Sequence, residues 1–290
     1  MIDNYKNSTL VFKSLKIIIS ILILLITSAY NLRAQQVSFR SHNTYVSPPL
    51  PSQLITNGMV LFLDASDVSS YSGTGTIWTN TGSGSAAFNA NMFNSPAFVQ
   101  SGLASYFTFN GNNGFSINRP VQDDMTWAAW IKTTQTGGGS GQFYTAYSIF
   151  GGEMPGGTND YAVVLGDGKL GFGNGSNDIT SYSTKSINDN LWHYITVTRN
   201  ATSGEVNLYI DGILDKTFTT STGSLTAPSK IGIAYNANVT GDPRFVGNMA
   251  IAQAYSVVLT AKGHKSAHPD GHNASHVVVS VVGNVVAMAG

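Results

Sequence analysis

The stretch "LWHYITVTRNATSGEVNLYIDG", Leu191 to Gly212, decides how we interpret the fold of this chain. Side chains of a β-strand point alternately to opposite faces. In the first apolar run, alternation places His193, Ile195 and Val197 on one face, and the second run alternates in the same way. The five residues 200–204 between the runs are enough to reverse the chain. The stretch therefore predicts a β-hairpin with one face buried.

The Trp-His pair at the head of this hairpin also raises the question of catalysis. A catalytic histidine needs a nucleophile or a carboxylate within hydrogen-bond reach. A histidine packed among aliphatic side chains needs only one backbone or hydroxyl partner. Because His193 shares its predicted face with Ile195 and Val197, we interpret it as part of the scaffold.

The composition of the whole chain favours an all-β protein without charge-based recognition. The chain has 290 residues, no cysteine, 15 basic and 15 acidic side chains, and 10% charged residues, where about 25% is typical. A formal net charge of zero offers no basic surface for phosphates, so we expect no nucleic-acid partner. The 31 glycines indicate many tight turns between short strands. Without disulfides, the core alone must stabilise the fold.

Two further turns are nearly explicit in the sequence. Asp167-Gly168 and Asp211-Gly212 each lie between apolar runs, and Asp and Gly tolerate the positive φ angles of a type I′ turn. Strands joined by such turns are antiparallel, and many of them must form a sandwich or a barrel to bury their apolar faces. The strands that we expect are Met59–Leu63, Tyr106–Phe109, Met125–Lys132, Tyr161–Leu165, Lys169–Phe172, Leu191–Arg199, Glu205–Ile210, Lys230–Tyr235 and Phe245–Tyr255.

The N-terminal part of the chain has the organisation of a secretory signal. Three lysines precede the apolar run Ile17 to Ile26, and small or polar residues follow it, with Ala29 or Ala34 as the cleavage position. About ten apolar residues are too few to span a bilayer, although an uncleaved membrane anchor stays open as the alternative. We therefore predict a signal peptide over residues 1–34 and a proline-containing linker over residues 35–57.

Five stretches of the chain, in order, carry a resemblance to a known family. The hairpin above has the pattern W-H-x-[apolar]-x-V followed by Y-[apolar]-D-G, and it resembles the LamG-like jellyroll domains of the concanavalin A-like lectin/glucanase superfamily, relatives of laminin G modules and pentraxins. Similar in order are "GMVLFLDASDVSSYSGTGTIWTN", "YFTFNGNNGFSI", "MTWAAWIKT" and "FVGNMAIAQAYSVVLT". The resemblance covers Gly58 to Thr260, and it implies an all-β, two-sheet antiparallel jelly-roll sandwich over residues 58–260.

The resemblance does not decide whether this chain is an enzyme, because the superfamily contains both enzymes and binding modules. Relatives that cleave β-glucans carry an E-x-D-x-E or E-x-D-x-x-E strand, which brings two carboxylates to one face. This chain has only two glutamates, Glu153 and Glu205, and neither begins such a motif. We therefore expect no enzymatic activity, and a glycoside hydrolase of the same superfamily is the alternative.

Recognition of a sugar needs exposed aromatic rings beside polar groups. Aromatic residues that we expect in loops near Asn, Asp or Gln, and that we name as candidate ligand-binding residues, are Phe143, Tyr144, Tyr147, Tyr182, Tyr235 and Trp78. The resemblance also implies calcium at the rim of the sandwich. Calcium binds six to eight oxygen atoms, and Asp64, Asn110 and Asn112 are the candidate ligands, although we favour simple turn formation for these residues.

The C-terminal residues 261–290 depart from the family. Four histidines recur at every fourth position, from His264 to His276, but Pro269 and Gly271 oppose the helix that would align them. Weak binding of transition metals by a flexible tract stays open. The valine-rich end around Gly283-Asn284 resembles a hairpin with an exposed edge.

These observations predict a secreted or cell-surface binding module. Its partner is expected to be a glycan or an extracellular protein, bound at the loops of the rim. The absence of cysteine fits a bacterial envelope or medium better than a eukaryotic matrix. A structural or adhesive surface protein without a small ligand is a further alternative.

Overall fold

The computed structural model describes residues 54–101, 104–139, 141–175, 178–242, 244–261 and 279–281. Its elements are almost all strands. They are β1 (Met59–Asp64), β2 (Ile77–Trp78), the 3-10 helix η1 (Ser85–Phe88), β3 (Ala90–Phe93), β4 (Ala97–Ser101), β5 (Ala104–Asn110), β6 (Gly114–Asn118), β7 (Met125–Lys132), the 3-10 helix η2 (Phe143–Thr145), β8 (Tyr147–Gly152), β9 (Tyr161–Gly166), β10 (Lys169–Asn174), β11 (Ile179–Ser186), β12 (Trp192–Arg199), β13 (Glu205–Ile210), β14 (Ile213–Thr219), β15 (Lys230–Ile233), β16 (Val246–Tyr255), β17 (Leu259–Ala261) and β18 (Val279–Val281).

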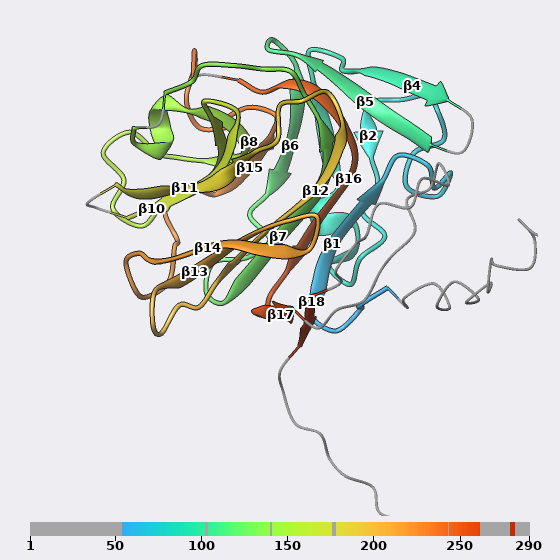
Figure 1. The fold of residues 1–290 in the computed structure, drawn as a ribbon. Helices are drawn as coiled ribbons and strands as arrows, with labels where there is room; N and C mark the ends of the chain where they lie inside the picture. Colours follow the sequence, from blue (N-terminus) through green and yellow to red (C-terminus); the bar gives the residue numbers. More distant parts are fainter. Residues whose placement is uncertain are drawn as a thin grey trace, which may run out of the picture. The chain divides into compact units, whose positions relative to one another are not determined.

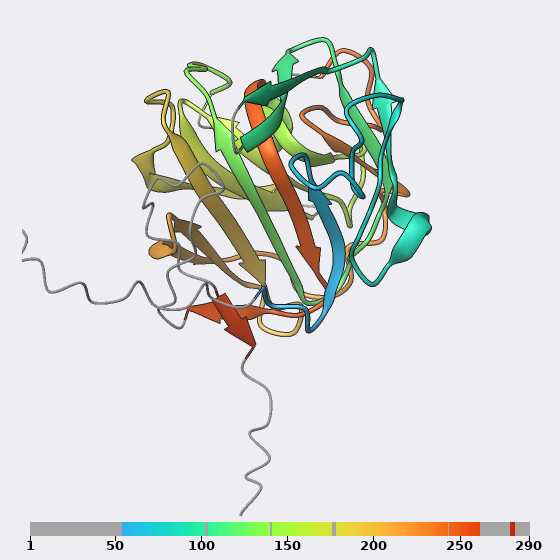
Figure 2. The same cartoon turned by 90° about the vertical axis from the view of Figure 1, so that its right-hand side faces the viewer.

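Two eight-stranded antiparallel sheets pack face to face as a jelly-roll sandwich (Figures 1 and 2). Sheet I has the strand order β14-β13-β12-β7-β16-β5-β4, and β1 pairs with β16 beside β5. Sheet II has the order β11-β10-β9-β8-β15-β6-β3-β2. In both sheets, strands distant in the sequence are neighbours, as the crossing connections of a jelly roll require. The predicted fold class is confirmed.

The hairpin that opens the sequence argument forms β12 and β13. Ile195 pairs with Ile210 and Arg199 pairs with Val206, so the register agrees with the predicted alternation. Its other neighbour is β7, where Val197 lies opposite Trp127. The hairpin is therefore joined directly to the central strand of sheet I.

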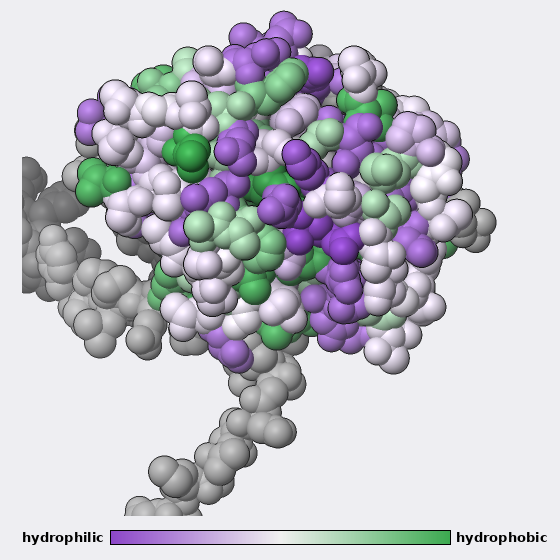
Figure 3. Space-filling view, turned by 180° about the vertical axis from the view of Figure 1, so that it is seen from behind, coloured by the Kyte–Doolittle hydropathy of each residue, from purple (hydrophilic) through white to green (hydrophobic). Residues whose placement is uncertain are grey.

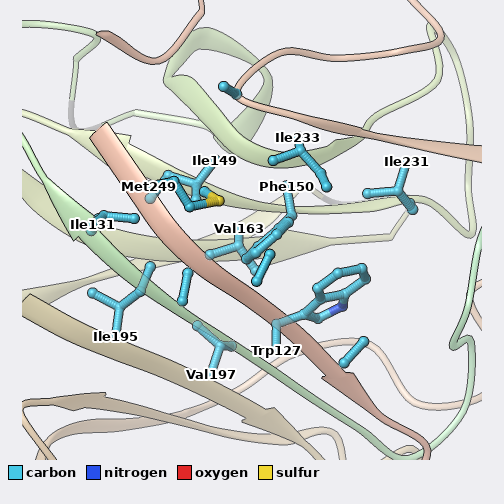
Figure 4. Close-up of a cluster of buried hydrophobic side chains, with 14 of the residues drawn as sticks. Trp127, Ile131, Ile149, Phe150, Val163, Ile195, Val197, Ile231, Ile233 and Met249 are labelled. Carbon is cyan, nitrogen blue, oxygen red and sulfur yellow. The ribbon is translucent and has the colours of Figure 1, made fainter. Parts of the chain in front are cut away.

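The space between the sheets is filled by one apolar cluster. Side chains of β7, β12 and β16 from sheet I meet those of β8, β9 and β15 from sheet II (Figure 4). Trp127 is 1% exposed, and its ring lies 4.5 Å from that of Phe150 in the opposite sheet. Burial of each such large side chain contributes about 1.5–3 kcal/mol, which compensates for the absence of disulfides.

The two predicted type I′ turns are present. Asp167 and Gly168 have φ angles of 49° and 76°, and Asp211 and Gly212 have 52° and 74°. All nine predicted strands are present; Met125–Lys132 and Glu205–Ile210 have the predicted bounds, and the other seven have shifted ends. Strands that the list of expected strands left out are β2, β3, β4, β6, β8, β11, β14, β17 and β18, which are short, polar or contain glycine.

The outer face of sheet II carries glycine and other small residues at several positions, and two loops pack on it there. A Cβ atom on Gly232 would lie 2.1 Å from the carbonyl oxygen of Tyr235, and one on Gly151 would lie 2.7 Å from Cα of Asn236. The loop after β15 therefore crosses this face at a distance that only glycine allows. Further along the same face, Phe143 of η2 packs on Ala162 and Val164 of β9.

The C-terminal region contributes a third, two-stranded sheet. In it, β18 pairs antiparallel with β17, and Leu259 lies opposite Val281. The predicted signal peptide, most of the predicted linker, the four C-terminal histidines and the predicted hairpin at Gly283-Asn284 lie outside the described residues. Within the described part of the chain, no helix is long and apolar enough to cross a membrane.

His193 is buried, as predicted, but its partners differ from the prediction. Its Nδ1 lies 2.9 Å from a carboxylate oxygen of Asp211, and its Nε2 lies 3.0 Å from one of Asp189. Asp211 also binds Lys185 of β11, at the edge of the opposite sheet. We expected one backbone or hydroxyl partner among aliphatic residues, and this was wrong. His193 instead links the loop before β12, the turn after β13 and the edge of sheet II.

The charges of this cluster depend on one another. Burial lowers the pKa of His193, but the carboxylates of Asp211 and Asp189 outweigh it and raise the pKa overall. Burial raises the pKa values of Asp189 and Asp211, but hydrogen bonds, including those from His193, lower both overall. The cluster reaches solvent at Asp189 and at Lys185, whose side chains are both about half exposed. The arrangement is a partly buried ionic link between sheet I and the edge of sheet II.

This link predicts how stability depends on pH. Stability contributed by His193 is complete below its unfolded pKa and is lost as pH rises through the raised folded pKa. Stability contributed by the two aspartates is lost as pH falls through their lowered pKa values. We therefore expect His193→Gln to destabilise the protein by about 1–3 kcal/mol at about pH 5.5, and by less at about pH 8.5. Urea unfolding at both pH values measures this, and an equal loss at both would contradict it.

Candidate functional site

A pocket opens at the end of sheet II where β8 and β10 end and β9 and β11 begin. Its volume is about 430 Å³, within the range of small-molecule sites. The loop between β8 and β9 forms most of it, and Tyr144 of η2 and Asp178 of the β10–β11 loop complete it. The described residues that line it are Tyr144, Glu153, Met154, Pro155, Gly156, Gly157, Thr158, Asp160 and Asp178.

Glu153 lies at the inner side of this pocket, directly after β8. Nδ2 of Asn236 donates a hydrogen bond to its carboxylate over 3.0 Å and a second one to its carbonyl oxygen. The same amide also donates to Asp242 over 2.6 Å. Burial and then the negative charges of Asp242, Asp160 and Asp178 raise the pKa of Glu153 to about 7, against the lowering effect of the Asn236 hydrogen bond.

Asp160 stands at the start of β9 and is 2% exposed. One carboxylate oxygen accepts a hydrogen bond from the backbone N–H of Met154 over 2.9 Å. The other oxygen, Oδ1, is buried and has no hydrogen-bond partner. Burial is the main cause that raises the pKa of Asp160. No ion pair joins Glu153 or Asp160 to a basic residue in the described chain.

Of the aromatic residues predicted to bind ligand, Tyr144 is the most accessible. It is 38% exposed, and its hydroxyl donates to Oε1 of Gln142. This fixes the ring at the edge of the pocket, where the neighbouring groups are carboxylates and the loop 153–158. An aromatic face beside hydrogen-bond acceptors is the arrangement that stacks on a sugar ring and binds its hydroxyls.

Two of the predicted ligand-binding residues are core residues, which corrects the prediction for them. Trp78 is 0% exposed and packs in the main core, with its ring 4.8 Å from that of Phe107. Phe143 is 1% exposed because it covers Ala162 and Val164 on the outer face of sheet II. Neither side chain presents a face to a ligand.

The other three predicted tyrosines hold loops in place. The hydroxyl of Tyr147 donates to the carbonyl oxygen of Thr136, and that of Tyr182 to the carbonyl oxygen of Gly141. Both therefore fix the glycine-rich loop before η2 and are only partly exposed. Tyr235 is 7% exposed and stacks on the ring of Phe93. None of the three lines the pocket.

The predicted calcium ligands are not brought together. Asp64 lies opposite Ile251 of β16, whereas Asn110 lies opposite Val246. Five residues along a strand correspond to about 16 Å. Asp64 and Asn110 instead accept hydrogen bonds from backbone N–H groups two residues ahead, and Asn112 is the donor in the second of these turns. The turn interpretation holds for them.

The carboxylates of the pocket escaped the sequence analysis because they come from separate loops. Asp160 and Asp178 end the similar segments "GGTND" and "GSND", each between two strands of the same sheet. Glu153 was considered only as the start of a glucanase motif. Acidic residues at the ends of glycine-rich turns were the signal that could have found the pocket.

The raised pKa of Glu153 predicts a further dependence of stability on pH. The pKa of Glu153 is higher in the folded protein than in the unfolded chain. The folded protein therefore loses stability as pH rises from about 4.3, the unfolded value, to about 7, the folded value. Glu153→Gln removes this loss, so we expect the variant to gain melting temperature relative to the wild type as pH increases from 4 to 8. Thermal unfolding checks this, with Glu205→Gln on β13 as the matched control. A difference that does not change with pH would contradict the burial of an ionisable Glu153.

The fold of the chain resembles binding domains of known structure. Domain 4 of a GH43 extracellular arabinanase from Geobacillus stearothermophilus, in complex with arabinotriose, has 16% identity and a TM-score of 0.51, over 71% of this chain and 96% of that one. The binding domain of Paraclostridial Mosquitocidal Protein 1 has 16% identity and a TM-score of 0.50, over 70% of this chain and 50% of that one. The botulinum neurotoxin serotype D ligand-binding domain in complex with N-acetylneuraminic acid has 14% identity and a TM-score of 0.50, over 71% of this chain and 49% of that one.

The chain thus spans about half the length of the two toxin domains. At these identities the similarity is one of fold. A search of curated protein sequences found no match. A sequence model of the concanavalin A-like lectin/glucanases superfamily matches residues 101–263, which is more than half of the chain. This chain belongs to the concanavalin A-like lectin/glucanase superfamily.

Proposed function

We propose that this chain is a secreted or cell-surface, non-catalytic module that binds a glycan in the pocket at Tyr144. The observation that carries the proposal is an exposed aromatic ring fixed beside carboxyl groups that have no ion-pair partner among the described residues, in a pocket of about 430 Å³. The ring stacks on the apolar face of a sugar, and the carboxylates accept hydrogen bonds from its hydroxyls. The known structures with the same fold that hold arabinotriose or N-acetylneuraminic acid support this proposal.

Secretion is supported by the apolar run at Ile17 to Ile26 behind three lysines. A protein partner has less support from the surface. On the face shown in Figure 3, apolar residues are scattered among polar ones instead of forming one large patch, and large contiguous apolar patches are what mark protein interfaces.

The proposal predicts that Tyr144→Ala weakens glycan binding. On a glycan array of neutral oligosaccharides, we expect the wild type to bind a defined set and Tyr144→Ala to bind it with affinity reduced about tenfold or more, because the variant loses the aromatic face that contacts the sugar. Tyr106→Ala, on the outer face of sheet I, is the matched control and should bind like the wild type.

A blank array for the wild type would favour a structural or adhesive role. Loss of binding in Tyr106→Ala but not in Tyr144→Ala would move the site to the other sheet. The rival activity, hydrolysis, has one observation in its favour, which is a glutamate with a pKa of about 7 beside other carboxylates. We expect no release of reducing ends, and release by the wild type that Glu153→Gln abolishes would establish the hydrolase instead.

For calcium, the pocket at Tyr144 is a better candidate site than the residues Asp64, Asn110 and Asn112 that the sequence suggested. The buried and unpartnered Oδ1 of Asp160 is an acceptor that a cation would complete, and Glu153 and Asp178 lie in the same pocket. No three acidic or histidine side chains of the described residues converge at one point. A calcium ion there would therefore also need backbone carbonyl oxygens, which are among its usual ligands.

If calcium binds there, it stabilises the folded state by mass action. We expect calcium at about 100 times its Kd to raise the unfolding free energy of the wild type by about 2.7 kcal/mol and to leave Asp160→Asn unchanged. Asp64→Asn is the control, because the structure separates Asp64 from the pocket, and it should respond like the wild type. An unchanged melting temperature of the wild type with millimolar calcium would contradict the site.

A further inference from the structure

A second cluster, outside the pocket, lies on the outer face of sheet II. The rings of Phe93 and Tyr235 are stacked, with centroids 4.8 Å apart and planes at 12°. The guanidinium of Arg244 lies over both rings, 5.1 Å from the centroid of Phe93 and 5.6 Å from that of Tyr235. Such contacts hold the cation in one place.

The fold builds this cluster from three separate segments. Phe93 ends β3, Tyr235 follows β15, and Arg244 stands just before β16. Tyr235 fits because Gly114 of β6 has no side chain, since a Cβ there would lie 2.6 Å from the ring. The backbone carbonyl of Arg244 accepts a hydrogen bond from Nε2 of Gln135, which fixes the residue from the other side.

The guanidinium of Arg244 differs from the other two described in this structure. Those of Arg119 and Arg199 donate hydrogen bonds to backbone carbonyls or to an amide side chain, over 2.7–3.2 Å. Among the described residues, the guanidinium of Arg244 has no hydrogen bond and no ion pair. Its positive charge lowers the pKa of the nearby Asp242, but the hydrogen bond to that carboxylate comes from Asn236.

A positioned guanidinium with open donors is a site for an oxyanion. The planar group offers parallel N–H donors that match a carboxylate in bidentate geometry, and stacking on aromatic rings leaves these edges available. Arg244 and Phe93 are partly exposed, and exposed amide side chains lie on the turns beside them, where Nδ2 of Asn94 donates to the backbone carbonyl of Asn112. Amides of this kind bind sugar hydroxyls.

We infer that Arg244, held on Phe93 and Tyr235, binds the carboxylate of an acidic sugar. This subsite is distinct from the pocket at Tyr144. The loop 234–244 runs between the two, because its Asn236 contacts Glu153 and its Arg244 lies on Phe93. The inference takes its ligand class from the proposed function, and it predicts that an acidic glycan is preferred over a neutral one of equal length.

The test compares trigalacturonate with galactotriose by calorimetry on the full protein. We expect trigalacturonate to bind the wild type more tightly, and Arg244→Gln to weaken it about tenfold or more, as expected for the loss of a charge-assisted hydrogen bond. Lys216→Gln, which removes an exposed positive charge on β14, is the matched control and should bind like the wild type. Arg244→Lys keeps the charge but not the planar fork, so its affinity should be intermediate.

The site would be disproved if the wild type does not bind trigalacturonate, or if Arg244→Gln binds it as tightly as the wild type while retaining its melting temperature. An equal loss in Lys216→Gln would indicate unspecific charge attraction and would also disprove it. The proposed pocket is tested separately, because galactotriose binding should depend on Tyr144 and not on Arg244. A third outcome separates the two proposals. If trigalacturonate binds in a way that depends on Arg244 but no neutral glycan binds, the result supports this site and contradicts the proposed function of the pocket.

Discussion

The constraint on which the rest depends is the placement of small residues on the outer face of sheet II. Residues such as Gly151 and Gly232 let the loop after β15 pack against the strands themselves, where a methyl group would collide with its backbone. On the same face, Ala162 and Val164 accept Phe143 of η2. Both loops are held by these contacts, and the groups that they carry are therefore positioned by the sheet rather than by their own flexible chain.

Both candidate sites follow from this packing. The pocket lies where η2 meets the loops after β8 and β10, with Tyr144 on its edge and Glu153 at its inner side. The stack that carries Arg244 lies where the loop after β15 crosses β6. The first site is acidic and the second is basic, so the two surfaces favour different parts of a ligand. Asn236, which contacts Glu153, belongs to the loop that also carries Arg244.

Much of the fold could be predicted because it is encoded by local patterns. Alternation over Leu191 to Gly212 and the two Asp-Gly turns each depend on a few adjacent residues. The partners of His193 could not be predicted in this way, because Asp211 reaches it only once the hairpin has closed. Similarly, β8 and β11 contain glycine or polar residues whose strand conformation depends on pairing with their neighbours.

The candidate site was harder to predict for the same reason. Tyr144 was among the predicted residues, but Trp78 and Phe143 also stand beside polar residues in the sequence and are buried. Which aromatic side chain covers a sheet and which faces solvent is decided by the position of the small residues beneath it. Asp160 and Asp178 are brought together by the pairing of β9 with β10, which the sequence indicates, but the pocket also needs η2.

The central claim is that recognition occurs on the loops packed on sheet II. Hydrogen–deuterium exchange of the protein with and without a bound glycan tests it most directly. The account predicts protection in the segments 141–160, 174–182 and 234–246, with β7 and β12 unchanged. Protection confined to β7, β12 and β16 would place the ligand on sheet I and contradict the account.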